Sequence, residues 1–137
     1  MAYRILVVDD EAHILHVLSL KLRNAGHDVL TSVDGEEAFE LACQELPDIV
    51  ITDFQMPYMT GLELCRALAD YGPTSQIPVL IITARGYALD DEDLQIGNIK
   101  GVISKPFSPR AVLKLVNDLP GCAADETGLR KSRTKTG

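Results

Sequence analysis

Short, continuous apolar runs alternate along this chain with longer stretches in which apolar residues recur every three or four positions. A continuous run indicates a strand buried on both faces, as in a parallel sheet, whereas the longer period indicates an amphipathic helix. The predicted strands are Ile5–Val8, Val29–Thr31 (a weaker run), Ile49–Ile51, Val79–Ile82 and Val102–Ile103. Because crossovers between parallel strands are right-handed, the alternation predicts one sheet with helices on both faces.

Helices are predicted over residues 11–25, 35–45, 60–70, 88–96 and 108–118. Their ends carry the expected signals: Asp34 as an N-cap, Gly26 as a C-cap, and Ser108 followed by Pro109 as N-cap and first helical residue. Five strand–helix units in succession predict a doubly wound α/β domain over residues 1–120. Residues 121–137 lose the apolar period and are rich in Lys, Arg, Ser and Thr, which predicts a basic, disordered tail.

The composition narrows the classes of function. A chain of 137 residues fits one domain, and its formal net charge is −7. Residues 1–122 carry nine basic and eighteen acidic side chains, which argues against direct DNA binding by this domain. Three widely spaced cysteines offer no disulfide framework, and no apolar stretch approaches the ~20 residues that span a bilayer. We therefore expect a cytoplasmic protein without a membrane segment.

Charged residues follow three of the predicted strands. Asp9 and Asp10 end the first apolar run, Asp53 ends the third, and Lys105 follows the fifth. The carboxyl ends of parallel strands meet at one edge of a sheet, so these side chains should share a crevice there. Three gathered carboxylates repel one another unless a cation joins them, and hard oxygen ligands suit Mg²⁺.

This set predicts phosphoryl transfer. A carboxylate at a strand end can accept a phosphoryl group as an aspartyl-phosphate, and Asp53 is the candidate acceptor. Asp9 and Asp10 would hold Mg²⁺, and the Lys105 ammonium would pair with a phosphoryl oxygen. After the fourth strand, the Thr83 hydroxyl can donate to a second phosphoryl oxygen, and the small Ala84 leaves room for the group.

At these residues the chain resembles the receiver domain of two-component response regulators. The matching pieces occur in the family's order over about residues 3–119: Asp9-Asp10, Asp53 with Met56-Pro57 and Gly61, Thr83-Ala84, and Lys105-Pro106-Phe107. The resemblance implies the flavodoxin-like fold with strand order 2-1-3-4-5. It also implies that a histidine kinase or a histidine phosphotransfer protein donates the phosphoryl group to Asp53.

The resemblance further implies details of the site. Mg²⁺, with Mn²⁺ as an alternative, would be bound by Asp10, Asp53 and the main-chain carbonyl of Gln55, with Asp9 contacting it through water. Gln55 and Arg85 occupy the positions that modulate a slow intrinsic hydrolysis of the acyl phosphate. A cis peptide bond is implied between Lys105 and Pro106.

One position departs from the family pattern. Receiver domains usually place Tyr or Phe three residues before the site lysine, where the ring moves inward when the threonine shifts toward the phosphoryl group. Here that position is Val102, and Tyr87 in the loop after Thr83 is the candidate substitute.

Several readings of the whole protein stay open. The leading one is a stand-alone regulatory phosphoacceptor, not an enzyme, that signals by phosphorylation-dependent binding to an unidentified protein, with a phosphorylation-dependent dimer as one form. An alternative is a receiver cut from a larger regulator or hybrid kinase. An aspartyl-nucleophile phosphatase is disfavoured, because Gln55 stands where such enzymes need a second aspartate. A scaffold that no longer takes phosphate is disfavoured because no site residue is missing.

Overall fold

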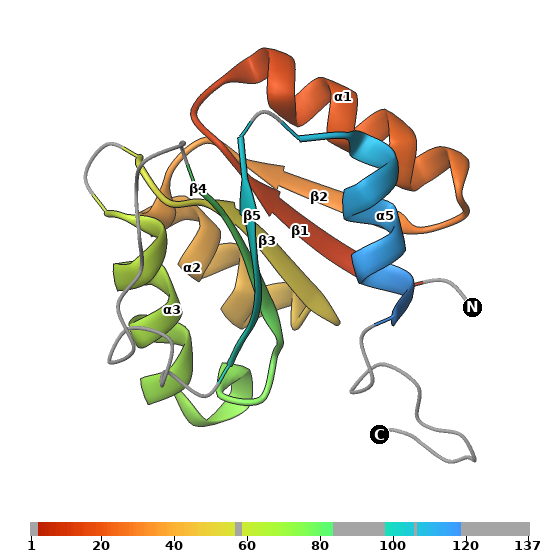
Figure 1. The fold of residues 1–137 in the computed structure, drawn as a ribbon. Helices are drawn as coiled ribbons and strands as arrows, with labels where there is room; N and C mark the ends of the chain where they lie inside the picture. Colours follow the sequence, from red (N-terminus) through yellow and green to blue (C-terminus); the bar gives the residue numbers. More distant parts are fainter. Residues whose placement is uncertain (1–2, 57–58, 84–97, 106, 119–137) are drawn as a thin grey trace.

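The apolar runs form five parallel strands, in a computed structural model that describes residues 3–56, 59–83, 98–105 and 107–118. The strands are β1 (Arg4–Val8), β2 (Asp28–Ser32), β3 (Ile49–Asp53), β4 (Val79–Thr83) and β5 (Ile99–Ser104). They make one sheet in the order β2-β1-β3-β4-β5 (Figure 1). The predicted doubly wound fold and strand order are confirmed.

The helices described are α1 (Ala12–Asn24), α2 (Gly35–Glu45), α3 (Gly61–Asp70), α5 (Pro109–Asp118) and a short 3₁₀ helix, η1 (Gly72–Thr74). Asp34 caps α2 as predicted, because its side chain accepts a hydrogen bond from the Glu37 N–H at 2.8 Å. Gly26 lies two residues beyond Asn24, directly after the C-cap residue Ala25, with φ of 97°, a conformation that favours glycine. The predicted helix over 88–96 and the tail over 121–137 lie outside the described residues.

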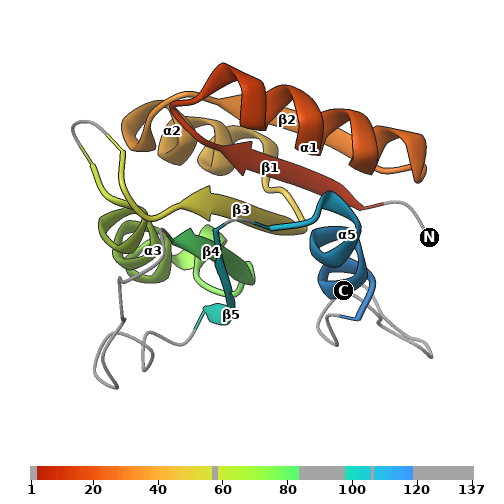
Figure 2. The same ribbon diagram turned by 45° about the horizontal axis from the view of Figure 1, so that its top comes forward.

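The sheet lies between two layers of helices, α1 with α5 and α2 with α3 (Figure 2). The three central strands send alternate residues to the two layers. In β1, Ile5 and Val7 pack with the α1 and α5 side chains, whereas Leu6 and Val8 pack with those of α2 and α3. Residues Ile5–Val8 and all of β3 and β4 are buried, as the continuous runs predicted. Burying each such aliphatic side chain contributes roughly 1.5–3 kcal/mol, so both faces hold the strands in register.

The strand β5 departs from the expectation of burial on both faces. Val102 is 41% exposed, although its neighbour Ile103 is buried. The reason is topological: β5 lies at the edge of the sheet and pairs only with β4 among the described strands. No helix among the described residues is long and apolar enough to cross a membrane.

The register of the strands fixes where the functional side chains begin. Val8 of β1 pairs with Thr52 of β3, so the next residue of each strand, Asp9 and Asp53, lies abreast at the carboxyl edge. Both residues continue the alternation that sends Val7 toward α1 and α5. The same pairing of hydrophobic strands that makes the core therefore brings these two carboxylates together.

Candidate functional site

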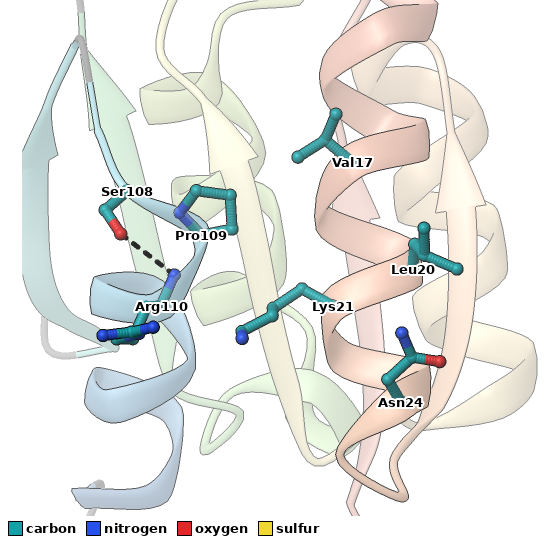
Figure 3. Close-up of a pocket in the computed structure, with 7 residues that line it drawn as sticks. All are labelled: Val17, Leu20, Lys21, Asn24, Ser108, Pro109 and Arg110. Atoms are coloured by element: carbon teal, nitrogen blue, oxygen red, sulfur yellow. Dashed lines mark hydrogen bonds between the residues drawn. The ribbon is translucent and has the colours of Figure 1, made fainter.

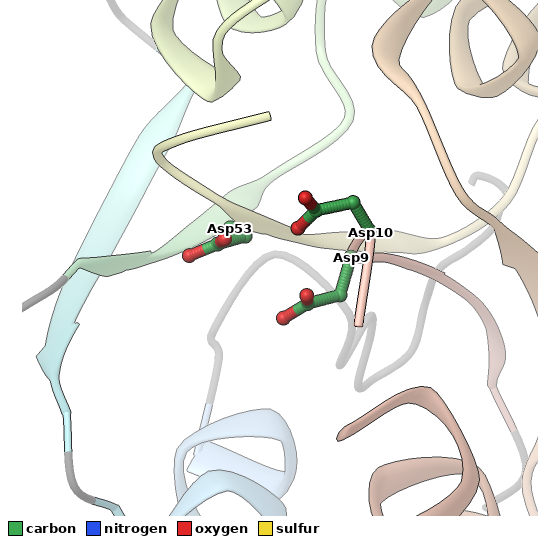
Figure 4. A group of neighbouring side chains, drawn as sticks. All are labelled: Asp9, Asp10 and Asp53. Atoms are coloured by element: carbon green, nitrogen blue, oxygen red, sulfur yellow. The ribbon is translucent and has the colours of Figure 1, made fainter. Parts of the chain in front are cut away.

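Three aspartates form a compact carboxylate cluster at the carboxyl edge of the sheet (Figure 4). Asp9 and Asp10 come from the segment after β1, and Asp53 is the last residue of β3. Each offers one carboxylate oxygen, and these oxygens lie within 4.8 Å of one another. Asp9 and Asp53 are buried, whereas Asp10 is exposed. The sequence-predicted cluster is thus present, with two members withdrawn from solvent.

Lys105 supplies the positive charge for this cluster. Its Nζ lies 3.2 Å from Oδ1 of Asp53 and 4.0 Å from Oδ2 of Asp9. The backbone of Lys105 is also held, because its N–H donates to the Thr83 carbonyl at 2.8 Å. This bond extends the β4–β5 pairing by one residue and directs the lysine across the end of β4 toward β3.

The protonation of these groups reflects burial first and charge second. The pKa of Asp9 is raised from 3.8 to about 6, mainly by burial and also by the nearby Asp53, against the Glu11 N–H and Lys105, which lower it. Burial also raises the pKa of Asp53, with Lys105 opposing the rise. Partial burial of Lys105 acts to lower its pKa, but Asp53 and Asp9 outweigh that effect and the pKa is raised. The site therefore keeps a cation beside carboxylates that resist ionisation.

One carboxylate oxygen of Asp9 is left without a hydrogen-bond donor among the described residues. Oδ1 accepts the Glu11 N–H at 2.8 Å, but Oδ2 is buried and accepts no hydrogen bond from them. The Lys105 ammonium lies 4.0 Å from Oδ2, beyond hydrogen-bonding distance. A buried carboxylate oxygen with no donor is costly unless a cation compensates it. A divalent cation such as Mg²⁺ fits this site, because it prefers hard oxygen ligands. The cluster offers such ligands from Asp9 and from the two further carboxylates.

The loop after Asp53 is tied back to the strand by Gly61. The Gly61 N–H donates to the Phe54 carbonyl at 2.8 Å, and a Cβ at residue 61 would overlap the Asp53 carbonyl oxygen. Only glycine permits this approach. Met56 is buried in the core on the α2–α3 face.

The structure describes some of the other predicted site residues and not others. Thr83, the last residue of β4, is buried at the same edge, and Gln55 is exposed in the loop after β3. Val102 lies exposed on β5. Four residues with predicted roles lie outside the described part of the chain: Ala84, Arg85, Tyr87 and Pro106. The predictions for these residues, including the cis bond between Lys105 and Pro106, therefore stay predictions.

Glu11 is a site neighbour that the sequence reasoning missed. Its Oε1 lies 3.4 Å from the Lys105 Nζ, although its side chain is 60% exposed. The position directly after the acidic pair is the only signal in the sequence, and it does not by itself indicate a contact with a lysine so distant along the chain.

An apolar groove lies elsewhere, between α1 and the start of α5 (Figure 3). None of the three aspartates lines it. Its lining residues are Val17, Leu20, Lys21, Asn24, Ser108, Pro109 and Arg110. The groove is therefore separate from the carboxylate cluster.

Comparison with known proteins agrees with the fold. The sequence matches the family model of the response regulator receiver domain over residues 5–117. It is 39% identical over 113 residues to the alkaline phosphatase synthesis transcriptional regulatory protein PhoP of Bacillus subtilis, covering 82% of this chain and 46% of PhoP. The chain belongs to the response regulator receiver domain family.

Solved structures give the same fold. The chemotaxis response regulator CheY4 of Vibrio cholerae superposes with a TM-score of 0.78 at 31% identity, covering 85% of this chain and 98% of CheY4. The receiver domain of the sensor histidine kinase PA1611 from Pseudomonas aeruginosa, which has a magnesium ion coordinated in its active site cleft, has a TM-score of 0.75. At 24% identity, over 85% of this chain and 96% of that one, this likeness shows the fold alone. The chain spans about half the length of the curated relatives it matches.

Proposed function

We propose that Asp53 accepts a phosphoryl group from a phosphorylated histidine of a histidine kinase or histidine phosphotransfer protein. The observation that carries this proposal is the Asp53 carboxylate, buried at a strand end, with the Lys105 ammonium 3.2 Å from Oδ1. In the transfer, a bond forms between an Asp53 oxygen and phosphorus while the bond from phosphorus to the donor nitrogen breaks. The product is an acyl phosphate on Asp53.

The residues of the chain contribute position and charge. Lys105 balances negative charge on one phosphoryl oxygen, and the Thr83 hydroxyl donates to another. The small side chain of Ala84 leaves space for the group. Because burial raises the pKa of Asp53, the lysine has a second role: it favours the ionised carboxylate that attacks phosphorus.

Asp9, Asp10, Asp53 and the main-chain carbonyl of Gln55 would hold Mg²⁺, or Mn²⁺ in its place. The support is the three clustered carboxylates and the buried Asp9 Oδ2, which accepts no hydrogen bond from the described residues. When bound, the cation neutralises charge on the phosphoryl oxygens and on the carboxylates. Without such a cation, the three carboxylates of the cluster outweigh the Lys105 ammonium, and their charge opposes the approach of an anionic donor.

The proposal extends to the lifetime and consequence of phosphorylation. Gln55 and Arg85 modulate a slow hydrolysis of the acyl phosphate, and the protein acts as a regulatory phosphoacceptor and not as a turnover enzyme. The output is protein binding. Exposed apolar side chains on β5 and α5, Val102 and Leu115, support a recognition surface there. With Val102 at the usual aromatic position, Tyr87 is the proposed switch residue.

The proposed setting is a cytoplasmic signalling pathway with an unidentified downstream protein and no direct DNA contact by this domain. A dimer formed on phosphorylation belongs to the same proposal. Because the curated relatives are about twice as long as this chain, a receiver belonging to a larger regulator is the alternative setting. The acceptor chemistry is the same in both.

Intact mass after incubation with Mg²⁺ and acetyl phosphate tests the acceptor. Wild type should gain one phosphoryl group of about 80 Da, and Asp53→Asn should gain none. Asp70→Asn is the matched control, because Asp70 is an exposed carboxylate at the end of α3 and should leave the gain intact. A gain that persists in Asp53→Asn, or that needs no divalent cation, would contradict the proposal.

A further inference from the structure

Glu11 stands at the N-cap of α1 but does not cap it. Its backbone has the extended N-cap conformation, and its carbonyl accepts from the N–H groups of Ile14 and Leu15 at 3.1 Å. Its side chain makes no capping hydrogen bond to this helix, and glutamate is not among the residues that cap helices well. The carboxylate instead reaches the Lys105 ammonium at 3.4 Å. The side chain therefore contributes to the site and not to the helix end.

Glu11 differs from the other carboxylates of the site. Asp9, Asp10 and Asp53 bring oxygens within 4.8 Å of one another, and Glu11 is not part of that group. The described contact of its carboxylate at the site is with Lys105, the cation that also lies 3.2 Å from Asp53. One ammonium is thus shared between a buried acceptor carboxylate and an exposed carboxylate at the mouth of the site.

We propose that Glu11 is a positioning residue that draws the Lys105 ammonium toward solvent and so weakens the capture of anionic phosphodonors. This inference rests on the proposed function of Asp53 as acceptor. A phosphoryl oxygen and the Glu11 carboxylate compete for the same ammonium, and Glu11 also adds a negative charge that an anionic donor must approach. Removing that charge frees Lys105 for the donor.

The size of the effect follows from donor charge. In a water-like dielectric, one unit charge acting across about 6 Å changes an equilibrium by about threefold for each unit charge on the ligand. For Glu11→Gln, we expect the apparent second-order rate of phosphorylation to rise about threefold with singly charged phosphoramidate. With doubly charged acetyl phosphate the rise should be about tenfold. The gain should lie in the donor concentration at half-saturation, with the maximal rate little changed.

A double-mutant cycle identifies Lys105 as the partner. Rates are measured by intact mass at saturating Mg²⁺ for wild type, Glu11→Gln, Lys105→Gln and the double variant, with both donors. The Glu11→Gln gain should be smaller when Lys105 is already replaced, because the competition for the Lys105 ammonium is then gone and only the direct repulsion of the donor by Glu11 remains. Glu36→Gln is the control for loss of one exposed charge, and it should behave as wild type.

Each outcome decides the inference. Equal rates for Glu11→Gln and wild type, or equal gains with the two donors, would overturn it. A gain of unchanged size in the Lys105→Gln background would also overturn it, because the direct repulsion of the donor by Glu11 would then account for the whole effect and the contact with Lys105 for none of it. If wild type takes no phosphoryl group, or if Asp53→Asn is labelled equally, the proposed function fails and this inference fails with it.

Discussion

Nζ of Lys105 lies 3.2 Å from Oδ1 of Asp53, although β4 separates the strands from which the two residues come. The lysine spans that strand because its backbone N–H is fixed to the Thr83 carbonyl. One side chain thereby links the end of the fifth strand to the end of the third. The pair sets the charge balance of the whole site.

Replacing Lys105 should separate metal binding from phosphoryl transfer. In Lys105→Ala, the loss of a cation beside the carboxylates should tighten Mg²⁺ binding by up to about tenfold, since like charges no longer repel. Phosphorylation of Asp53 should slow by at least about tenfold, because a charge that stabilises the phosphoryl oxygens is gone. Titration calorimetry and intact mass measure the two effects. Weaker Mg²⁺ binding in this variant would show that the lysine positions the carboxylates and does not compete with the ion.

The stability of the metal-free protein should depend on Asp9. Its pKa is raised from 3.8 to about 6 in the folded state, so between these values the folded protein holds a proton that the unfolded chain releases. The free energy of unfolding should therefore fall as pH rises from about 4 to 6, by up to about 3 kcal/mol from this residue. Urea unfolding in EDTA across that range measures the slope.

Asp9→Asn isolates that contribution. Without Mg²⁺ the variant should be more stable than wild type above pH 6, because the buried charge is absent, and the two should converge below pH 4. Added Mg²⁺ should stabilise wild type more at pH 7.5 than at pH 5, since the ligands must be deprotonated, and should stabilise the variant less. Parallel pH profiles for the two proteins would refute this account.

Two glycine substitutions should differ sharply. Gly61→Ala places a methyl group against the Asp53 backbone and should cost about 1–3 kcal/mol, with slower phosphorylation, because the acceptor strand end must shift. Gly72→Ala has no atom within 4 Å of the new methyl group and should change stability by less than about 0.5 kcal/mol. Urea unfolding and intact mass report both quantities. Equal stability of the two variants would mean that the loop after β3 relaxes freely.

Adjacent positions on β5 should also respond differently to an aromatic ring. Val102→Tyr restores the usual residue of the family at a site that is 41% exposed, and should change stability by less than about 0.5 kcal/mol. Ile103→Tyr inserts a ring into the core beside α5 and should cost about 1–3 kcal/mol or more. Thermal unfolding checks the contrast. A strongly destabilised Val102→Tyr would mean that this side chain is covered in solution.

The sequence predicts most of this fold because its signals are local. The helix over residues 35–45 is observed with those bounds, since Asp34 caps its start and Leu46 ends it in a left-handed conformation. The predicted strands are shorter than the observed ones by one to four residues, mostly where polar residues such as Asp28 and Ser32 pair without adding to an apolar run. The exposure of Val102 was not predictable from its apolar run, because strand order decides it.

The candidate site also has a part that the sequence predicts and a part that it does not. Asp9, Asp10, Asp53 and Lys105 could be found because charged residues after apolar runs are visible in the sequence, and parallel strands bring their ends together. The contact between Glu11 and Lys105 could not be predicted from the sequence, because it depends on how far one exposed side chain reaches across a loop.

The pairing of Val8 with Thr52 has a consequence for how this protein can vary in length. Deleting one residue inside β1 or β3 would move its terminal carboxylate by about 3.3 Å and turn it to the opposite face of the sheet. Such a change would exchange the contents of the two cores and move Asp9 or Asp53 away from Lys105 at the same time. Insertions and deletions should therefore be confined to the connections at the amino edge of the sheet, whereas the strands can change only by substitution.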